Sequence, residues 1–556
     1  MKNFSLFFIL FFILYISNLS NASDYIEPSQ EFRGVWVSPF SGDINYKSQD
    51  QFVEDMNFIF DTIKEYKMNA IIFHVRINND ALYQSDYNPL FSQFKKVNFT
   101  IFDPINWIIE ECHKRGIEFH AWMNPYRIVS KSSKTLDEII TDYIQYPKNP
   151  ASQKSNIMEG KQYYLLNPGL QNVRDFLIDT VLEFLNKYKE VDAIHFDDYF
   201  YNNPIESGDD QEIYKEYIDS HPEVKDIIKD KSDWRREQVN LLIHSLHNKI
   251  VEFNQKNNKN ILFGISPSGI YKTCENNNES VAYDTEGNAI TSGVCSNGMQ
   301  HYESHLFCDS LKWINKGWID YIIPQIYWAH DHDIAPYKKI IEWWNKVVLK
   351  KNINLYGGIG LYKCYDGNDV YSWRTDENEL YNQLTFSPEE NDEQKVEGFC
   401  IFQFTALKQF KDNTKNEICS NLVKNGIKAW KMIVPPSEIK SFNRINLPAP
   451  ENCKLINNGS ISFKRVYNSK FYIIYRTEED QINFNSSEII DIFGSNEEEI
   501  IWNDKEEGNY TYGVKALSYS NTLGEGAIAL NGYGNYIKSK INYFFIILLL
   551  VLIDLS

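Results

Sequence analysis

Basic residues are scarce in this sequence. It contains 56 lysines and arginines against 75 aspartates and glutamates, which gives a formal net charge of −19 over 556 residues. Such a surplus of negative charge repels phosphate backbones and lacks the basic patch that nucleic-acid binding requires. We therefore expect no nucleic-acid partner, and interpret the charge mainly as a contribution to solubility.

The C-terminal end lacks a hydrophobic run long enough to cross a bilayer. Tyr543–Ile553 is apolar, but it is about half the length that a spanning helix needs. A short spacer, Tyr533–Ile541, precedes it, and the small residues Asn531 and Gly532 precede the spacer. A small site, a spacer and a hydrophobic tail are typical of a GPI-anchor signal, so we predict one over residues 531–556 with attachment at Asn531. The alternative is a short membrane segment or a degenerate tail.

The N-terminal end has the pattern of a secretory signal peptide. Lys2 is followed by the apolar run Phe4–Ile16 and by small polar residues at Ser20–Ser23. This pattern predicts a removed signal over residues 1–23. We expect a protein that is secreted, held at the extracellular face of the plasma membrane through its C-terminal anchor, or delivered to the endolysosomal lumen.

Cysteines are also few, eight in all. Several fall on predicted strands or helices, where buried thiols are expected. Cys274 and Cys295 flank a polar insertion and could be bridged, although the pairing does not follow from sequence. Five sequons offer possible glycan acceptors, at Asn98, Asn278, Asn458, Asn485 and Asn509.

Apolar, strand-like segments recur along the first three quarters of the chain, with amphipathic helical stretches between them. The segments are Phe32–Val37, Ala70–Val75, Glu118–Trp122, Val191–Phe196, Ile261–Ile265, Tyr321–Ile326, Leu355–Leu361 and Gly398–Phe404. Near-continuous apolar strands that alternate with helices indicate a parallel sheet covered on both faces. We predict an α/β fold, a (β/α)8 barrel of the TIM type over residues 31–433. Three insertions follow strand ends and should build its rim: Ile128–Pro168, Asn202–Ser232 and Tyr271–His305.

The pattern changes after two proline-containing boundaries, at Val434–Pro436 and Leu447–Pro450. Beyond them lie short alternating strands with no long helix: Ser460–Phe463, Phe471–Tyr475, Glu499–Trp502 and Tyr510–Leu517. This indicates a small all-β sandwich over residues 447–530. The stretch from Tyr510 to Ser518, followed by Gly524–Gly526, resembles the last strands of a fibronectin type III module.

Two adjacent carboxylates end the fourth strand-like segment. Asp197 and Asp198 follow Val191–Phe196 directly, at the end of a barrel strand where catalytic groups are found. Glycoside hydrolysis needs one acid to protonate the leaving oxygen and a second carboxylate to attack the sugar or activate water. Neighbours on a strand point to opposite faces, so both acids reach the pocket only if the strand has ended there. If only one of the two acids faces the pocket, we rank Asp197 slightly ahead of Asp198. The second acid would then be Asp80, Asp309, Asp331 or Asp333.

Other strand ends carry polar and aromatic residues suited to sugar binding. The residues that we expect to contact substrate are Arg76, Asp80, His120, Trp122, Asn124, Tyr126, Arg127, His195, Tyr199, Ser266, Gln325, Tyr327 and Trp328. We predict neither cofactor nor metal. A metal site built from His74, His120, His195 or His330–Asp333 is a weaker alternative, because no HxH pair marks an early strand. A serine nucleophile at Ser266 is weaker still, since Pro267 and Ser268 break the G-x-S-x-G pattern.

Seven motifs, taken in order, resemble the glycosyl-hydrolase-like 10 family. They are Glu31–Val37, Asp80–Ser85, Phe119–Arg127 (FHAWMNPYR), Leu166–Gly169, Ala193–Tyr201 (AIHFDDYFY), Gly264–Gly269 and Lys312–Trp328. The resemblance covers most of Phe32–Phe404. It implies a β/α barrel that hydrolyses an amino-sugar-containing polysaccharide, with peptidoglycan strands the best-known substrate type. An N-acetyl group on the sugar would open a second mechanism, in which the substrate acetamide attacks and one acid orients it. The rival hypothesis is an inactive barrel that serves as a carbohydrate-binding surface protein.

Overall fold

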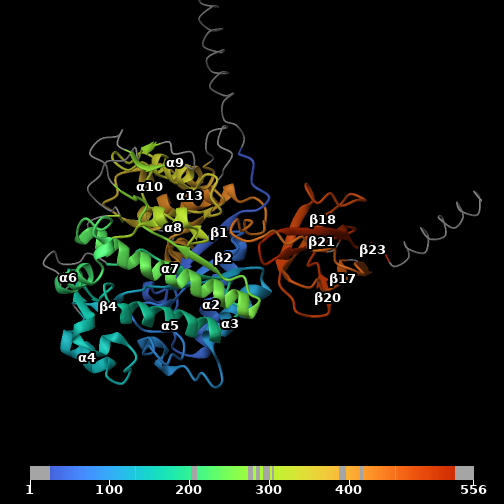
Figure 1. Ribbon diagram of the computed structural model, residues 1–556. Helices are drawn as coiled ribbons and strands as arrows, with labels where there is room; N and C mark the ends of the chain where they lie inside the picture. Colours follow the sequence, from blue (N-terminus) through green and yellow to red (C-terminus); the bar gives the residue numbers. More distant parts are fainter. Residues whose placement is uncertain are drawn as a thin grey trace, which may run out of the picture.

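The computed structural model describes residues 25–531, with gaps at 132, 202–209, 273–279, 284–288, 292–300, 303–305, 387–395, 413–416, 458 and 507. A helix-covered barrel forms most of this part of the chain, and an all-β module lies beside it (Figure 1). The barrel occupies the sequence up to the proline-containing linker, and the module follows the linker.

A parallel sheet forms the centre of the larger part. Its strands are β1 (Phe32–Val37), β2 (Ala70–Arg76), β3 (Glu118–Met123), β7 (Ala193–Phe196), β8 (Leu262–Ile265), β11 (Tyr321–Ile322), β12 (Gln325–Ile326), β13 (Asn354–Leu355), β14 (Gly357–Ile359) and β15 (Gly398–Ile401). These ten strands correspond to the eight predicted segments, because the sixth and seventh segments are each interrupted once.

The strands pair in an order that curls the sheet around on itself. From β1 the pairing runs through β2, β3, β7 and β8 to β11. β11 pairs with β13, and β12 pairs with β14. β14 then pairs with β15, and β15 pairs with β1. The prediction of a TIM-barrel-type fold is confirmed as a curled parallel sheet surrounded by helices.

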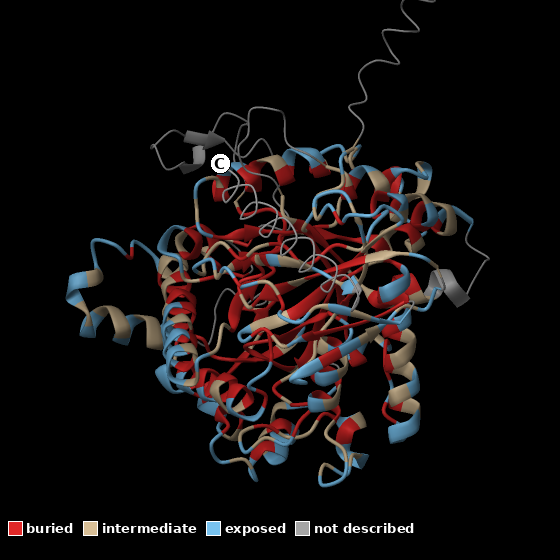
Figure 2. Ribbon diagram, turned by 90° about the vertical axis from the view of Figure 1, so that its right-hand side faces the viewer, coloured by how far each residue is buried: buried red, intermediate tan, exposed pale blue. Residues whose placement is uncertain are grey.

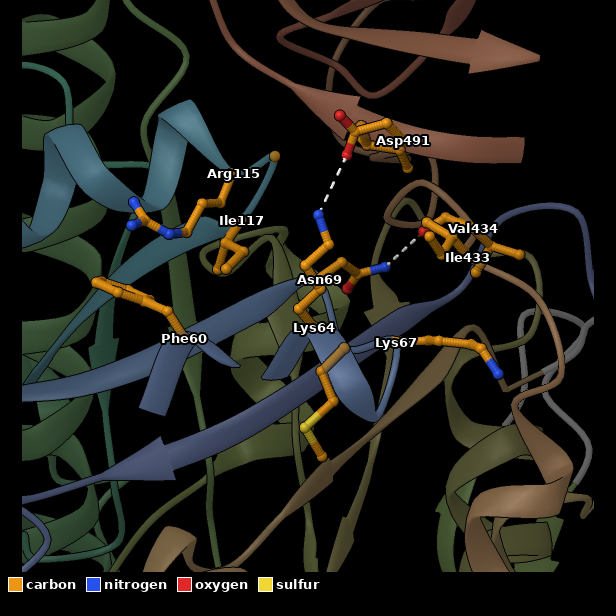
Figure 3. Close-up of a pocket in the computed structure, with 12 residues that line it drawn as sticks. Phe60, Lys64, Lys67, Asn69, Arg115, Ile117, Ile433, Val434 and Asp491 are labelled. Atoms are coloured by element: carbon orange, nitrogen blue, oxygen red, sulfur yellow. Dashed lines mark hydrogen bonds and ion pairs between the residues drawn. The ribbon is translucent and has the colours of Figure 1, made fainter. Parts of the chain in front are cut away.

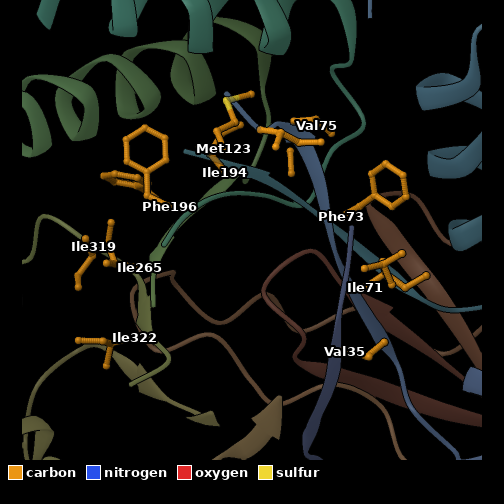
Figure 4. Packing of buried hydrophobic residues seen from close by; sticks show 14 of the residues in the cluster. Val35, Ile71, Phe73, Val75, Met123, Ile194, Phe196, Ile265, Ile319 and Ile322 are labelled. Carbon is orange, nitrogen blue, oxygen red and sulfur yellow. The ribbon is translucent and has the colours of Figure 1, made fainter. Parts of the chain in front are cut away.

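Side chains alternate between the inside and the outside of this sheet. Phe32, Trp36, Ile72 and Trp122 belong to an inner cluster. Their sequence neighbours belong to a larger outer cluster, which includes Val35, Ile71, Phe73, Val75, Met123, Ile194, Phe196, Ile265 and Ile322 (Figure 4). Both sets are almost fully buried, so the strands are apolar on both faces (Figure 2).

Helices cover the outer face. The longer ones are α2 (Gln49–Glu65), α3 (Pro104–Lys114), α5 (Gln171–Lys187), α7 (Lys231–Asn257), α9 (Tyr337–Val348), α12 (Phe404–Asp412) and α13 (Glu417–Gly426). Shorter ones are α8 (Ser310–Lys316), α10 (Ser372–Thr375) and α11 (Glu379–Leu384). Local sequence sets their starts: the Ser48 side chain accepts from the Gln51 amide at α2, and Asp103 with Pro104 begins α3.

The insertions after the strands add further elements. Ile128–Pro168 contributes α4 (Leu136–Tyr143) and a small antiparallel sheet of β4 (Arg127–Ser130), β6 (Tyr163–Leu166) and β5 (Ile157–Glu159). The second insertion contributes α6 (Gln211–Ser220), and the third contributes β9 (Ser280–Tyr283) and β10 (Ala289–Thr291).

The C-terminal module consists of two four-stranded sheets. One has the order β20 (Glu499–Asn503), β17 (Ser460–Lys464), β16 (Lys454–Asn457) and β23 (Leu530–Asn531). The other has the order β19 (Glu488–Phe493), β18 (Ser469–Thr477), β21 (Thr511–Ser518) and β22 (Leu523–Ile528). Each of the four strands expected from the sequence is present. The prediction of an all-β module is confirmed; its fibronectin type stays a prediction.

Several expectations concern the ends and the cysteines. The signal (1–23) and the tail from 532 onward lie outside the described residues, within which no helix is long and apolar enough to cross a membrane. Cys112, Cys308 and Cys400 are buried thiols, as predicted. Cys364 and Cys419 form a disulfide that the sequence did not suggest.

Other sequence expectations concern the cysteine pair and the glycan acceptors. Cys274 and Cys295, and the sequons at Asn278 and Asn458, lie outside the described residues. The remaining acceptors Asn98, Asn485 and Asn509 are exposed to solvent, so glycosylation at them stays a prediction.

Candidate active site

A cavity of about 180 Å³ opens at the carboxyl ends of the barrel strands. It is lined by Trp36, Ser38, Phe40, Ser41, His74, Trp122, Arg127, Tyr163, Asp197, Asp198, Tyr199, Ser266, Gln325, Tyr327 and Phe402. The strands that contribute are far apart in sequence and become neighbours when the sheet curls. This is the end of a TIM-type barrel where active sites occur.

Both adjacent carboxylates line the cavity. β7 ends at Phe196, so Asp197 stands directly after the strand and Asp198 lies in a bend. The alternation that would send neighbouring side chains to opposite faces therefore no longer applies at Asp198. The strand ends where the sequence analysis required it to end for both acids to face the same space.

Asp197 is almost fully buried and held by two donors. The Trp122 indole donates to its Oδ2 at 3.0 Å, and the Tyr199 amide donates to its Oδ1 at 3.2 Å. Burial raises its pKa well above the usual range, and the neighbouring charge of Asp198 raises it further. Arg127 and the two donors oppose this shift without cancelling it. Asp197 is therefore a fixed carboxyl group that favours its protonated form.

Asp198 is half-buried and more accessible. Burial raises its pKa to about 6, while a hydrogen bond from Gln325 and the charge of Arg127 lower it. Gln325 is itself fixed, since its Nε2 donates to the Ser266 carbonyl at 2.9 Å. A carboxyl group with a pKa of about 6 can both give and take a proton near neutral pH.

Aromatic rings and a guanidinium form the walls. The Arg127 guanidinium lies 4.1 Å from the Tyr199 ring centroid and 5.2 Å from that of Tyr163. On the other side, Tyr327 stacks on Phe402 at 5.4 Å. Aromatic walls suit the apolar face of a sugar, and a nearby cation suits its oxygens.

His74 lies at the cavity beside Trp122. The two rings stack at 3.7 Å with an interplanar angle of 7°. Its Nδ1 is 2.9 Å from Ser38 Oγ, whereas its buried Nε2 has no protein partner. Burial holds its pKa well below the usual range, so the ring is neutral.

The structure brings eight of the nominated residues together at the cavity. They are Trp122, Arg127, Asp197, Asp198, Tyr199, Ser266, Gln325 and Tyr327. Seven further lining residues were not nominated as substrate contacts, namely Trp36, Ser38, Phe40, Ser41, His74, Tyr163 and Phe402. Position gives a signal for two of them: Tyr163 lies on an insertion expected to form the rim, and Phe402 follows the last strand directly.

Four nominated residues do not line the cavity: three of them bond to the chain that follows β2 and β3, and Tyr126 is packed in the outer cluster. The buried Arg76 guanidinium donates to the Pro125 carbonyl at 3.0 Å and to Asn79 Oδ1 at 2.6 Å. Asp80 Oδ1 accepts from the Asn78 amide at 2.9 Å, which closes its own turn. The same region holds Asn124, whose Nδ2 donates to a main-chain carbonyl at 2.8 Å, and Tyr126, which is buried in the outer cluster. None of the four lines the cavity, and their contact with substrate stays a prediction.

Three others also lie outside the cavity. His120 and His195 are buried inside the barrel, where both bond to the Tyr321 hydroxyl. Trp328 packs against the outer cluster. The alternation of side chains along a strand shows only which face of the sheet a residue is on. The depth of that residue along the barrel axis depends on how the neighbouring strands pair.

The alternative acids have structural partners elsewhere. Asp309 caps α8 and accepts from the Tyr271 hydroxyl, and Asp331 accepts from the Ser372 amide. Asp333 is exposed and bonds to the Tyr371 hydroxyl. None of them, nor Asp80, lines the cavity. Within the described ranges, the acids at the cavity are Asp197 and Asp198.

The histidines weighed as metal ligands have other neighbours. His74 bonds to Ser38, His330 to Glu379 at 3.0 Å, and His332 accepts from the Ala335 amide at 3.0 Å. Among the residues that the structure describes, no group of three or more His, Cys, Asp or Glu side chains is arranged to hold a metal ion.

A TIM-type barrel with paired carboxylates in an aromatic cavity at its carboxyl end is the architecture of a glycoside hydrolase. Residues 31–372, more than half of the chain, match the family model described as "Glycosyl hydrolase-like 10". The chain belongs to this glycosyl hydrolase-like 10 family, and it is a glycoside hydrolase.

Two relatives in bacteria extend this comparison. Glycosyl hydrolase YngK of Bacillus subtilis (strain 168) is 28% identical over 492 residues, which cover 84% of this chain and 86% of the relative. Glycosyl hydrolase DigH of Escherichia coli (strain K12) is 29% identical over 360 residues, which cover 62% of this chain and 76% of the relative. The longer of these alignments extends beyond the residues that the family model covers.

Solved structures show more distant similarity. The PgaB (BpsB) glycoside hydrolase domain of Bordetella bronchiseptica aligns with a TM-score of 0.40 at 10% identity, covering 70% of this chain and 97% of that domain. The endo-1,4-beta-mannanase of Rhizomucor miehei also aligns with a TM-score of 0.40, at 11% identity, covering 73% and 98%.

Proposed function

We propose that this glycoside hydrolase cleaves O-glycosidic bonds in an amino-sugar-containing polysaccharide, with peptidoglycan-like strands as the favoured substrate. The observation that carries the proposal is the Asp197–Asp198 pair, two carboxyl groups with different environments in one aromatic-walled cavity. When the surroundings of two neighbouring acids push their pKa values apart, the pair can supply the two roles that glycoside hydrolysis needs.

The two acids differ in how free they are to act. Asp198 is partly accessible and has a pKa of about 6, so it suits the proton donor and acceptor at the glycosidic oxygen. Asp197 is fixed by the Trp122 indole and the Tyr199 amide, so it suits a group that holds a substrate atom in place.

If the substrate sugar carries an N-acetyl group, Asp197 has a definite catalytic role. In substrate-assisted cleavage the acetamide oxygen attacks the anomeric carbon, and a carboxyl group orients the acetamide. An anchored carboxyl group next to the acid–base residue supports this division of roles. Asp197 would orient the acetamide, and Asp198 would protonate the leaving oxygen and then activate water.

Turnover by purified protein tests the proposal. We expect new reducing ends from denuded peptidoglycan or from N-acetylglucosamine oligosaccharides. Asp197→Asn and Asp198→Asn should each lower kcat by about 10²–10⁴-fold, the usual contribution of an acid–base group. Asp333→Asn is the matched control, because this acid is exposed and lies outside the cavity. Binding of these glycans without any new reducing ends would instead support the carbohydrate-binding role.

We further propose that the protein is secreted and held at the cell surface by a GPI anchor attached near Asn531. The apolar N-terminal and C-terminal runs of the sequence support this. Release of the protein from intact cells by a phosphatidylinositol-specific phospholipase is the expected result. Retention on the membrane after this treatment would contradict the anchor.

We also propose that the C-terminal module is a fibronectin type III sandwich. Its sheet orders, β20–β17–β16 and β19–β18–β21–β22, support two packed layers of antiparallel strands of that kind, to which the short β23 adds a parallel pairing with β16. Such modules are usually spacers or binding appendages. A crystal structure whose sheets pair in another order would contradict this assignment.

A further inference from the structure

One charged side chain at the cavity has almost no partner in the protein. Arg127 begins β4 and lines the cavity, and only 4% of its surface is exposed to solvent. A guanidinium is permanently charged and carries five N–H donors. Within the described chain, the one hydrogen bond of Arg127 runs from Nη2 to the Ile77 carbonyl, at 3.5 Å. Its Nε is buried without an acceptor.

Even this single bond is weak. The Ile77 carbonyl is shared with Asn124, whose Nδ2 donates to it at 2.8 Å, whereas 3.5 Å lies beyond the usual range. Arg127 forms no ion pair with a carboxylate of the described residues. The rings of Tyr199 and Tyr163, with centroids at 4.1 Å and 5.2 Å, hold the guanidinium in place. These rings attract the charge but supply no oxygen acceptor for its N–H groups.

The other buried arginines of the described chain are well satisfied. Arg235, for example, forms a bidentate pair with Asp210, at 2.7 Å and 2.9 Å. The largely buried Lys470 of the module likewise lies 2.6 Å from Glu118 and 2.8 Å from Asp192. At least two hydrogen bonds to carboxylate, amide or carbonyl oxygens are made by each of Arg33, Arg76, Arg174, Arg235 and Arg236.

Cations also border a smaller hollow between the barrel and the module, and they have partners too (Figure 3). Lys64 lies 3.7 Å from Asp491. Lys67 and Arg115 donate to main-chain carbonyls at 3.1 Å and 3.0 Å. Burying a charge without partners is costly, so the exception at Arg127 indicates that its partner comes from outside the protein.

The remaining ionisable groups at the cavity do not cancel this charge in mild acid. Burial raises the pKa of Asp197 well above the usual range and that of Asp198 to about 6. Burial also holds the pKa of His74 well below its usual range, so this ring adds no charge. Below about pH 6 the cavity therefore holds one uncompensated positive charge, at Arg127. This is the range in which Asp198 has the proton that a general acid must deliver.

We propose that Arg127 is a specificity-determining residue, an anion subsite that binds a carboxylate carried by the substrate sugar. A carboxylate brings the single negative charge that is missing, and its planar oxygens match the planar guanidinium. The subsite rests on the proposed function, because it assigns a substituent to the polysaccharide. A lactyl carboxylate on a muramic sugar and a C6 carboxylate on a uronic sugar offer the same chemistry.

Two pairs of polysaccharides test the subsite and distinguish these sources. Soluble peptide-free peptidoglycan strands carry the lactyl carboxylate, and hyaluronan carries the C6 carboxylate beside N-acetylglucosamine. Coupling to methylamine neutralises the carboxylates of either. We expect wild-type full-length protein to cleave one acidic polymer with a kcat/KM about 10- to 100-fold above that of its amidated form, the range for a charged hydrogen bond. The pair that shows the preference locates the carboxylate. No preference for the acidic form in either pair would overturn the proposal.

Arg127→Met assigns the preference to this side chain. The charge of Arg127 opposes the burial that raises the pKa of Asp197 and Asp198, so its loss will change the rate on every substrate. The ratio of kcat/KM between the acidic and the amidated form removes this common effect, and we expect it to fall to about one. An unchanged ratio in the folded variant would overturn the proposal.

Lys131→Met is the matched control. Lys131 follows β4 on the same rim, pairs with Glu159 at 2.9 Å and does not line the cavity, so its loss should keep the wild-type ratio. Arg127→Gln repeats the test if Arg127→Met does not fold. The comparison of the two substrate forms with wild-type protein needs no variant and can overturn the proposal by itself.

Binding of monosaccharides separates the subsite from the proposed function. N-acetylmuramic acid, glucuronic acid and their methylamides have no bond between sugars to cleave, so their affinities do not depend on turnover. We expect wild-type protein to bind one of the acids about 10- to 100-fold more tightly than its methylamide, and Arg127→Met to bind the two forms equally. Absent turnover with this preference intact would refute the proposed function alone. Equal affinities of wild-type protein for the acid and amide forms of both sugars would refute the subsite.

Discussion

Trp122 and Asp197 are joined by an indole-to-carboxyl hydrogen bond of 3.0 Å across the first strands of the barrel. Trp122 lies on β3 and Asp197 follows β7, its neighbour in the sheet. The same indole lies flat against His74 at 3.7 Å, so its plane is fixed. Trp122 thus holds Asp197, a candidate catalytic residue, at a fixed position in the cavity.

Trp122→Phe should keep the ring stack and remove the hydrogen bond. Loss of a hydrogen bond to a carboxyl group that is ionised during part of the catalytic cycle costs about 1.5–3 kcal/mol. We expect kcat/KM to fall by about 10- to 100-fold, since each 1.36 kcal/mol is a factor of ten. Steady-state kinetics with thermal melts will check this. A rate equal to that of wild type at unchanged stability would show that this bond does not serve catalysis.

The pH dependence of kcat/KM should have a descending limb near pH 6. Asp198 must carry its proton to act as the acid, and its pKa is about 6, so activity falls as pH rises through that value. Gln325 lowers this pKa through its hydrogen bond. Gln325→Leu should therefore move the limb to higher pH. A limb that instead rises through pH 6 would assign Asp198 the role of base or nucleophile.

Gly264→Ala should destabilise the barrel by at least about 1–3 kcal/mol, the usual cost of overpacking. The new methyl group would collide with the ring of Tyr321. Urea unfolding measures the loss. Gly367→Ala is the control, because nothing lies within 4 Å of its added Cβ. Equal stability of the two variants would mean that Tyr321 is not confined as described.

The Cys364–Cys419 bridge should stabilise the barrel by about 4 kcal/mol. It closes a sequence separation of 55 residues, and a loop of that length restricts the unfolded chain strongly. The double substitution of both cysteines by serine should lower the free energy of unfolding by about this amount. Peptide mapping without reduction gives a separate check, since the two cysteine peptides should migrate as one.

Stability should fall in acid because of Glu118. Its pKa drops from 4.5 in the unfolded reference to about 2 in the folded chain. The folded state therefore gains stability that is complete above about pH 4.5 and is lost as pH falls through about 2, by about 3 kcal/mol. Glu118→Gln should flatten this part of the stability curve. A slope that persists in the variant would have to come from other carboxylates.

Much of the fold could be predicted from periodicity. The eight apolar segments correspond to the barrel strands, and β1 has the predicted limits because Phe32–Val37 is apolar on both faces. The limits of the sixth and seventh strands were less accurate, since each is interrupted within the predicted segment. Interruption depends on pairing with neighbouring strands, which a single segment does not reveal.

Placement at the cavity was predictable only where a residue stands at a strand end with a short path to the barrel axis. Asp197, Ser266 and Gln325 meet this condition and line the cavity. Arg76 stands at a strand end too, but its long side chain finds main-chain carbonyls after β3. Phe402 was missed because its contact with Tyr327 joins strands that are distant in sequence.

By itself the sequence determined the family, the order of strands and the pair of acids after Val191–Phe196, because periodicity and short motifs are local properties. Tertiary structure alone decided three things: that both acids share one cavity, that Tyr321 spans the barrel over Gly264, and that Lys470 reaches Glu118. Each depends on contacts between segments far apart in the chain, whose geometry is set only when the sheet curls and the module docks.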